Sequence, residues 1–113
     1  MSRPGQRDLS AVHVTRHALE RFAERFGVLA EDAESELRAT LRRTRRLGRN
    51  PASGAVAALA LHRGEILVAV LQDDSCLTVL TWPQFEPLLA EFGRSHLPRK
   101  PKRMMRRLVE GDG

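Results

Sequence analysis

The sequence predicts a single α+β domain, in which two N-terminal helices pack on a three- to four-stranded antiparallel sheet, followed by a C-terminal helix and a basic tail. Three observations lead to this class. Apolar residues recur at helical spacing as far as residue 47. They then form short β-branched runs between turn-like residues. A length of 113 residues suits one domain. We expect residues 1–10 to form a flexible arm, 11–93 the domain and 94–113 the tail.

The first elements expected are a short strand over residues 11–14 and a helix over residues 16–26. Thr15 is a suitable N-cap, because its hydroxyl can accept a hydrogen bond from a free backbone N–H of the first turn. Gly27 is a suitable C-terminal residue, since glycine adopts the left-handed conformation without strain. The apolar side of this helix comprises Ala18, Leu19, Phe22, Ala23 and Phe26.

A second helix is expected over residues 30–47, with a buried stripe of Ala33, Leu37, Leu41 and Leu47. Acidic residues crowd its first turns, and arginines 42, 43, 45 and 46 crowd its last. This polarity complements the helix macrodipole, so part of the arginine run has a structural explanation. Gly48 is expected to end the helix.

The next segment has the pattern of an antiparallel meander, with strands over residues 55–62, 65–72 and 76–81. The connections, Arg63-Gly64 and residues 73–75, are short and turn-like, and His62 and Arg63 are expected to be turn residues. A third amphipathic helix is expected over residues 82–92, with Pro83 in its first turn and Gly93 after it.

The net charge is +5, from 19 basic and 14 acidic residues, and nearly all of the basic residues are arginines. Both ends of the chain are basic, while residues 55–93 are acidic. An excess of arginine suits forked recognition of phosphate, although it can also serve only to keep a surface solvated. The residues expected to contact nucleic acid are Arg42, Arg43, Arg45, Arg46, Arg49, Lys100, Lys102, Arg103, Arg106 and Arg107.

Several classes of function are disfavoured by the composition. No apolar run approaches the roughly 18 residues that a membrane-spanning helix needs, and we expect no membrane partner, no secretory signal and a cytoplasmic location. The single cysteine, Cys76, excludes an internal disulfide and fits a small core position. The four histidines show no ligand spacing, so we expect neither a metal site nor a cofactor.

The first helix carries the most informative pattern, because His17, Arg21 and Arg25 follow one another at intervals of four residues and form one stripe. Arg21 and Arg25 repel each other at this spacing, although Glu20 and Glu24 offset part of the repulsion. Two interpretations remain open. The stripe is either an ordinary solvated face with Arg–Glu pairs, or a site that receives an anionic ligand or a carboxylate from elsewhere in the chain.

With the second helix and the meander, which ends in Thr-Val-Leu-Thr at residues 78–81, this His-x3-Arg-x3-Arg helix resembles the RelE-like nuclease fold over about residues 11–82. That fold groups the barnase, EndoU, colicin and RelE nucleases. Within it the chain is similar to small bacterial and phage proteins whose first helix reads His-Ala-x-x-Arg-x-x-x-Arg-Gly. Here Phe26 stands between Arg25 and Gly27.

The resemblance implies metal-independent RNA cleavage, in which a 2′-hydroxyl attacks the neighbouring phosphate. His17 then acts as base or acid, since its ordinary pKa of about 6.5 suits proton transfer at neutral pH. Arg21 and Arg25 hold the phosphate, and Thr81 donates a hydrogen bond to a phosphate oxygen.

Two alternatives use no catalysis. In the first, the chain is a noncatalytic basic protein that binds nucleic acid or a host complex such as the ribosome or RNA polymerase. A phage-encoded protein is one form of this alternative. A toxin-type protein would instead have an antitoxin as its partner. In the second, the chain is a partner-binding domain with Arg–Glu surface pairs. An apolar patch on the helix at residues 83–92, exposed if that helix does not pack on the sheet, would favour a dimer or partner interface.

Overall fold

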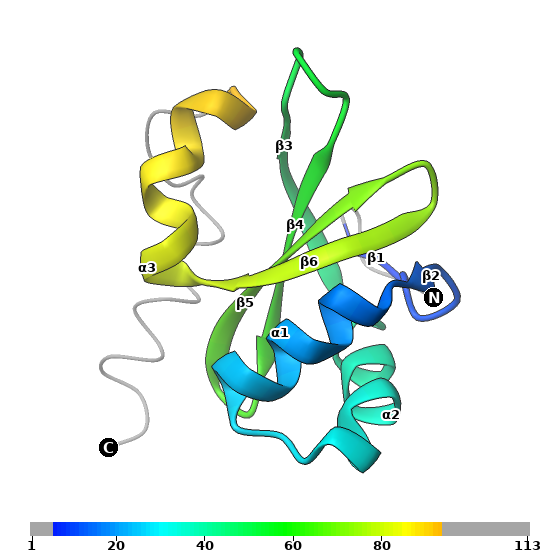
Figure 1. Ribbon diagram of the computed structural model, residues 1–113. Helices are drawn as coiled ribbons and strands as arrows, with labels where there is room; N and C mark the ends of the chain where they lie inside the picture. Colours follow the sequence, from blue (N-terminus) through cyan, green and yellow to red (C-terminus); the bar gives the residue numbers. More distant parts are fainter. Residues whose placement is uncertain (1–5, 94–113) are drawn as a thin grey trace.

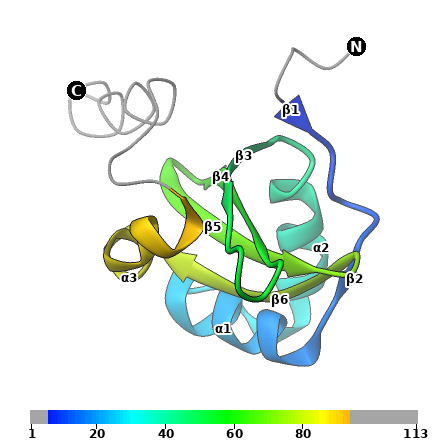
Figure 2. The same cartoon turned by 90° about the horizontal axis from the view of Figure 1, so that it is seen from above.

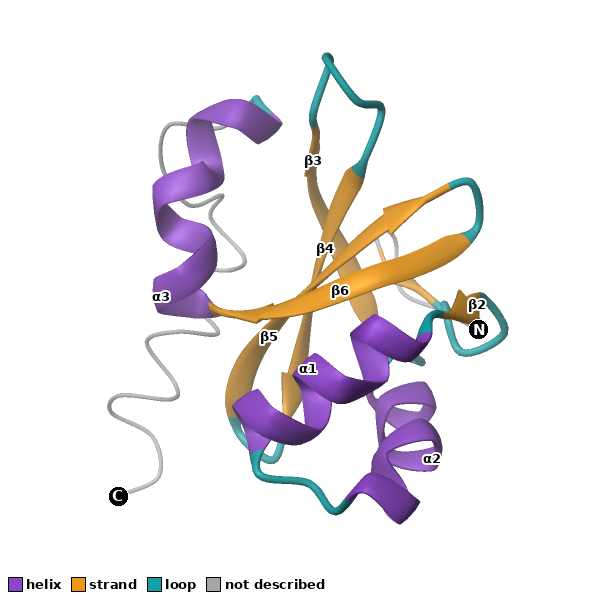
Figure 3. Cartoon of the chain, in the orientation of Figure 1, coloured by secondary structure: helices purple, strands orange, loops and turns teal. Residues whose placement is uncertain are grey.

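The computed structural model describes residues 6–93, which form an α+β domain with a helical layer on each face of a mixed sheet (Figures 1 and 3). The sheet order is β1-β3-β4-β5-β6-β2. The elements are β1 (Gln6–Arg7), β2 (His13–Val14), α1 (Arg16–Phe26), α2 (Ala30–Thr40), β3 (Thr44–Arg49), β4 (Val56–His62), β5 (Glu65–Gln72), β6 (Ser75–Thr81), α3 (Trp82–Phe85) and the 3₁₀ helix η1 (Glu86–Phe92).

The first helix is confirmed at both ends. The Thr15 side chain accepts a hydrogen bond from the backbone N–H of Ala18, and Gly27 adopts the left-handed conformation with φ of 64°. Ala18 and Phe22 are fully buried, and Phe26 is nearly so. Because these residues lie four apart, they form the side of α1 that packs on the sheet.

The second helix is shorter than expected, and this changes the interpretation of the arginine run. It ends at Thr40, and the chain turns through residues 41–43 into the strand β3. The expected helix over residues 30–47 is therefore wrong beyond Thr40. So is the helix-dipole explanation for arginines 42–46, since Arg38 is the basic residue of its last turn.

The error has a physical cause. Leu41, Thr44 and Leu47 are all buried, and this spacing of three fits one face of a helix, or a strand that is buried on both faces. In β3, Thr44 and Leu47 point to opposite faces of the sheet because side chains alternate along a strand, and both are buried because each face is covered. Long-range pairing with β4 and β1 thus overrides the local helical pattern.

The predicted meander is confirmed as β4, β5 and β6, but the sheet is larger and not purely antiparallel. The two connections, Arg63-Gly64 and Asp73-Asp74, all have positive φ, as two-residue hairpins require. Strands β1 and β3 extend the sheet on one side, and β2 pairs with β6 in parallel on the other. The expectation of three or four antiparallel strands is corrected to six strands in a mixed sheet.

The N-terminal segment is also more ordered than a flexible arm. Residues 1–5 lie outside the described part of the chain, but residues 6 and 7 pair with β3 as β1. The backbone N–H of Leu9 donates to the carbonyl of Leu41, and the carbonyl of Ser10 accepts from Arg38. Residues 6–10 therefore belong to the domain.

The C-terminal helix is confirmed as a single turn of α-helix followed by a 3₁₀ helix. It covers the face of the sheet opposite α1 and α2, as the view from above shows (Figure 2). Phe85, Leu89 and Phe92 are buried there against β3, β4 and β5. Gly48 is required beneath this helix, because a Cβ atom at that position would lie 2.0 Å from the carbonyl oxygen of Phe92. The helix at residues 83–92 therefore packs on the sheet, so the condition for an exposed apolar patch there is not met.

Candidate nucleic-acid interface

Helix α1 packs along β6, the strand next to the short outer strand β2, and this contact positions the predicted catalytic stripe. The Thr15 hydroxyl lies 3.1 Å from the carbonyl oxygens of both Cys76 and Leu77, at the start of β6. The backbone N–H of Thr15 donates to the same Cys76 carbonyl. Arg25, at the other end of α1, donates through Nη1 to the carbonyl oxygen of Val79 at 2.7 Å. Both residues donate to carbonyl groups along β6. Most of β6 has a strand partner on one side only, because β2 pairs with its first two residues.

The two arginines of the stripe are engaged in contacts within the protein. Arg25 binds the backbone of β6, and Arg21 forms an ion pair with Glu24 on the same helix, with 2.8 Å between Nη1 and Oε2. The Arg21 side chain is one-third exposed, at 32%. Of the two interpretations of the stripe, the structure gives Arg21 the intrahelical Arg–Glu pair, and it gives Arg25 a backbone contact that neither interpretation anticipated.

The other two predicted catalytic residues lie toward opposite ends of α1. His17 is exposed near the start of the helix, about 12 Å along the axis from Arg25 by the rise per residue. Thr81 is the last residue of β6, half-buried, and its backbone N–H donates to Oε1 of Gln84. The structure brings Arg25 close to the end of β6, but it does not gather the four side chains around one point.

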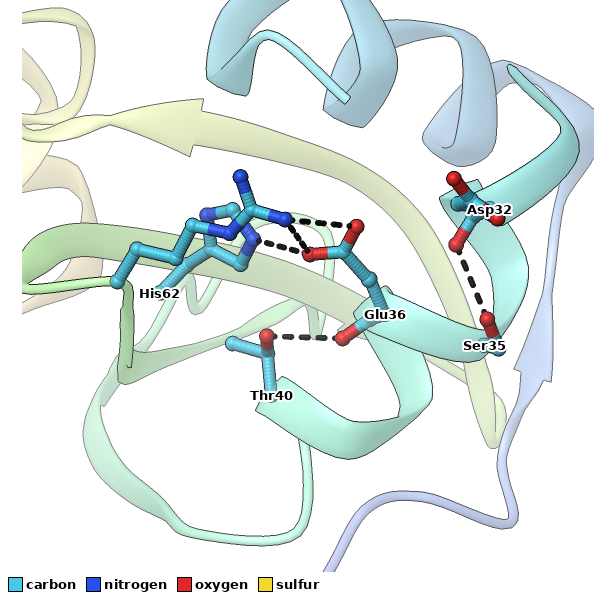
Figure 4. A network of polar contacts seen from close by, with 6 residues as sticks. Asp32, Ser35, Glu36, Thr40 and His62 are labelled. Atoms are coloured by element: carbon cyan, nitrogen blue, oxygen red, sulfur yellow. Dashed lines mark hydrogen bonds and ion pairs between the residues drawn. The ribbon is translucent and has the colours of Figure 1, made fainter. Parts of the chain in front are cut away.

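A second polar cluster, which the sequence did not suggest, joins α2 to the turn between β4 and β5 (Figure 4). His62 Nε2 and Glu36 Oε1 are 3.1 Å apart, and Arg63 Nη2 lies 2.9 and 3.1 Å from the two Glu36 oxygens. The His62 ring stands edge-on to Phe22 and Phe26, with centroid distances of 5.0 and 5.8 Å. The cluster therefore connects both helices to the sheet.

Glu36 lies between two nitrogen-bearing side chains in this cluster. The hydrogen bond with His62 is the largest cause that lowers the pKa of Glu36, and the Arg63 charge lowers it further. Arg63 occupies the turn as expected, but His62 is the last residue of β4 and only 6% exposed. The burial of His62 could have been inferred from its position in the strand. Residues 58, 60 and 62 share one face of β4, and Ala58 and Ala60 are buried.

A third feature is a concentration of arginines at the β1–β3 side of the sheet. We call it the arginine edge; its members are Arg7, Arg42, Arg43, Arg45, Arg46 and Arg49. Arg42 and Arg43 lie in the turn before β3, and the other four lie on the paired strands β1 and β3. Five of the six are predicted nucleic-acid contacts, and Arg7 is the one that sequence reasoning missed.

The arginine edge differs from the other arginines in its partners. Within residues 6–93, no arginine side chain of the edge forms an ion pair or a hydrogen bond. Arg42 is the member that interacts most with an acidic group. The pKa of Asp8 is lowered mainly by its hydrogen bonds with Ser10, and the charge of Arg42 lowers it further. Every other arginine in this part of the chain has a partner, so the cationic groups available to an anionic ligand are concentrated at one edge.

Beside the arginine edge, on the face of the sheet that α1 and α2 cover only in part, lies a pocket of about 250 Å³. Its floor is apolar and includes Val56 and Ala58 of β4 and Leu71 of β5. Arg7 and Arg46 line it on one side, and Asp73 and Asp74 line it at the β5–β6 turn. Leu9 and Val12 of the N-terminal segment close the side nearest the helices.

The remaining predicted contacts, Lys100, Lys102, Arg103, Arg106 and Arg107, lie outside the described residues.

Cys76 is buried as expected, and burial raises the pKa of its thiol to about 11, so it is a thiol at neutral pH. In residues 6–93 no three His, Cys, Asp or Glu side chains are grouped so as to hold a metal ion. No helix in this range has the length and apolar character needed to cross a membrane.

Comparison with known proteins found no match to this chain among protein families, curated proteins or solved structures.

Proposed function

We propose that this protein binds single-stranded RNA through the arginine edge, without cleaving it. The observation that carries the proposal is the absence of ion pairs from all six arginines of the edge within the described residues. Unpaired guanidinium groups that share one edge suit the phosphates of a nucleic-acid backbone, which they contact in forked geometry. RNA is the nucleic acid implied by the resemblance to RelE-like nucleases.

The strength of such binding is expected to come mainly from the release of counterions. Each phosphate contact on a single strand contributes about −0.7 to the slope of log K against log salt concentration. Six contacts would give a slope of about −4. Binding should therefore be strong at low salt and weaken steeply toward physiological ionic strength.

Ribonuclease activity has less support from the same geometry. Metal-independent cleavage needs a proton acceptor, a proton donor and a cation around one phosphate. Here Arg21 and Arg25 are engaged within the protein, and His17 is about 12 Å from Arg25 along the helix. RNA incubated with the full chain should stay intact, and His17→Ala should change nothing.

The test compares two double variants of the full chain that remove equal charge. Arg43→Gln/Arg49→Gln removes two exposed members of the arginine edge, whereas Arg16→Gln/Arg21→Gln removes two exposed or half-exposed arginines that are paired on α1. Binding is measured by fluorescence anisotropy with a labelled single-stranded RNA over a range of salt concentrations.

We expect the edge variant to bind about tenfold more weakly and to lose about 1.4 from the salt slope, which corresponds to two contacts. The α1 variant should keep both values near those of the unmodified chain. An equal loss in the two variants would show that binding follows net charge alone. Undiminished binding by the edge variant would place the RNA elsewhere. Either result, or a chain that binds no RNA, overturns the proposal.

A further inference from the structure

We propose that the pocket beside the arginine edge binds one unpaired guanine base of the RNA; this rests on the proposed function and adds a base preference to it. The pocket joins an apolar floor to charges of opposite sign on its two sides. Arg46 and Arg7 lie on β3 and β1, and Asp73 and Asp74 lie beyond β5, so the floor strands β4 and β5 separate them. Across the strands, β3 and β5 are two spacings apart, about 10 Å, and Asp73 also lies four residues beyond Ala69, which is level with Arg46 through its pairing with Ala58.

These charges are not used to hold the fold together. Within residues 6–93 no ion pair joins the arginines of the pocket to its aspartates, and none joins either group to another side chain. Asp73 and Asp74 are both exposed, and their positive φ holds them in the tight turn between β5 and β6. The pocket therefore presents donors at one side and acceptors at the other, with an apolar floor between them.

Guanine is the base whose edges match this arrangement. Its O6 and N7 accept a forked hydrogen-bond pair from an arginine. Its N1–H and N2–H₂ groups are adjacent donors on the Watson–Crick edge, which an ionised carboxylate accepts. Adenine and cytosine each place an acceptor beside the donor on that edge, and uracil has one donor between two acceptors. An acceptor facing Asp73 or Asp74 would be repelled, because an ionised carboxylate has no proton to donate.

The position of the pocket connects the base to the backbone contacts. Arg46 belongs to both features, and Arg49 pairs with Val56, a residue of the pocket floor. A strand that follows the arginine edge with its phosphates can therefore turn a base inward over β4. The aliphatic side chains of the floor contact the base plane, as the apolar walls of a pocket for an extruded base do.

The test uses the full chain and short uridine-rich RNAs with one central position changed. The central base is guanine, adenine or inosine, and inosine lacks the N2 amino group. Asp73→Asn/Asp74→Asn removes the carboxylates but keeps the turn, because asparagine tolerates positive φ. The matched control is Glu31→Gln/Asp32→Asn, which removes the same charge from exposed positions on α2. A parallel measurement replaces the RNA with free guanosine 5′-monophosphate.

We expect the guanine RNA to bind about tenfold more tightly than the adenine RNA, with inosine between them. The preference should disappear in Asp73→Asn/Asp74→Asn and persist in the control. Equal binding of all three RNAs with an intact salt slope overturns the guanine pocket and leaves the arginine edge in place. Binding of free guanosine 5′-monophosphate without RNA binding would retain the pocket as a nucleotide site and overturn the proposed function. If neither ligand binds, both proposals fail.

Discussion

The arginines within residues 6–93 fall into two groups that differ in what surrounds them. Those on α1, α2 and the β4–β5 turn are all bound to a carboxylate or a backbone carbonyl. Those of the arginine edge have no such partner within the described residues. The same residue type therefore has two uses in one small domain. Paired arginines hold elements together, whereas unpaired arginines remain available to a ligand.

The two outer parts of the sheet show the same contrast. On the β6 side, Thr15 and Arg25 donate to carbonyl groups of the strand, and α1 covers it. On the β3 side, the strand is rich in charge, which discourages pairing with another chain. Protection from aggregation is thus a simpler explanation for the arginine edge. It predicts no salt-dependent RNA binding, and the paired variants under the proposed function separate the two explanations.

The largest expected effect on stability is at Arg38, the paired arginine with the most partners. Its guanidinium donates to the carbonyls of Ser10 and Val12 at 2.7 and 2.8 Å and lies 3.1 Å from Glu34. Arg38→Ala should lower the free energy of unfolding by about 1–3 kcal/mol, because it leaves backbone acceptors without their donor. The measurement is urea unfolding beside Arg42→Ala, which should stay within about 0.5 kcal/mol. Equal losses would remove the distinction between the groups.

A second prediction concerns pH and the cluster around Glu36. Its pKa is lowered from 4.5, mainly by the hydrogen bond with His62, so the ionised carboxylate stabilises the fold above that pH. This stabilisation is lost as the pH falls through the lowered pKa of the folded state. Glu36→Gln should be less stable than the unmodified chain at pH 7, and the difference should shrink as the pH falls below 4.5.

Urea unfolding at several pH values measures this difference. Glu65→Gln is the control, because Glu65 is exposed at the start of β5 and has no ion pair in residues 6–93. A gap between Glu36→Gln and the unmodified chain that stays constant with pH would rule out the carboxylate charge as its source.

A smaller loss is expected at Arg25, which makes one hydrogen bond to the backbone of β6. Arg25→Ala should destabilise the domain by about 1 kcal/mol and leave RNA affinity nearly unchanged, since this arginine is engaged within the protein. Thermal unfolding and the anisotropy assay together measure the two quantities. Unchanged stability with a marked loss of RNA binding would restore Arg25 to the phosphate-binding role predicted from the helix pattern.

The smallest effect is expected at the exposed ion pairs of α1. Arg16 and Glu20 are 3.3 Å apart, with 94% and 54% of their side chains exposed. A double-mutant cycle with Arg16→Ala and Glu20→Ala should give a coupling energy below about 0.5 kcal/mol, because water screens the pair. A coupling well above 1 kcal/mol would mean that even the most exposed paired arginines are held in place.

Local signals predicted α1 well and β3 badly, and the difference has a physical reason. Thr15 and Gly27 act on backbone groups a few residues away, so their roles can be inferred from neighbouring positions. Thr44 and Leu47 become strand residues only because β4 lies beside them, and their spacing of three is ambiguous without it. The third helix was predicted from its apolar spacing, but its 3₁₀ portion was not.

The candidate site divides in the same way. The helical stripe of His17, Arg21 and Arg25 was found from its spacing, since four residues make about one turn. The groups that bind the arginines of this stripe could not be found from spacing. The carbonyl of Val79, for example, lies 54 positions from Arg25 along the chain. Nor did any local pattern show that residues from β1, β3 and the β5–β6 turn line one pocket.

By itself the sequence determined the α+β class, the limits of α1, the central meander and an excess of arginine, all of which depend on composition or on residues a few positions apart. The tertiary structure alone decided which arginines are paired and which are available. That outcome depends on contacts between segments that are distant along the chain. Two examples are the ion pair between Glu36 and Arg63 and the pairing of β3 with β4. The positive charge noted in the sequence thus becomes a defined edge beside a pocket.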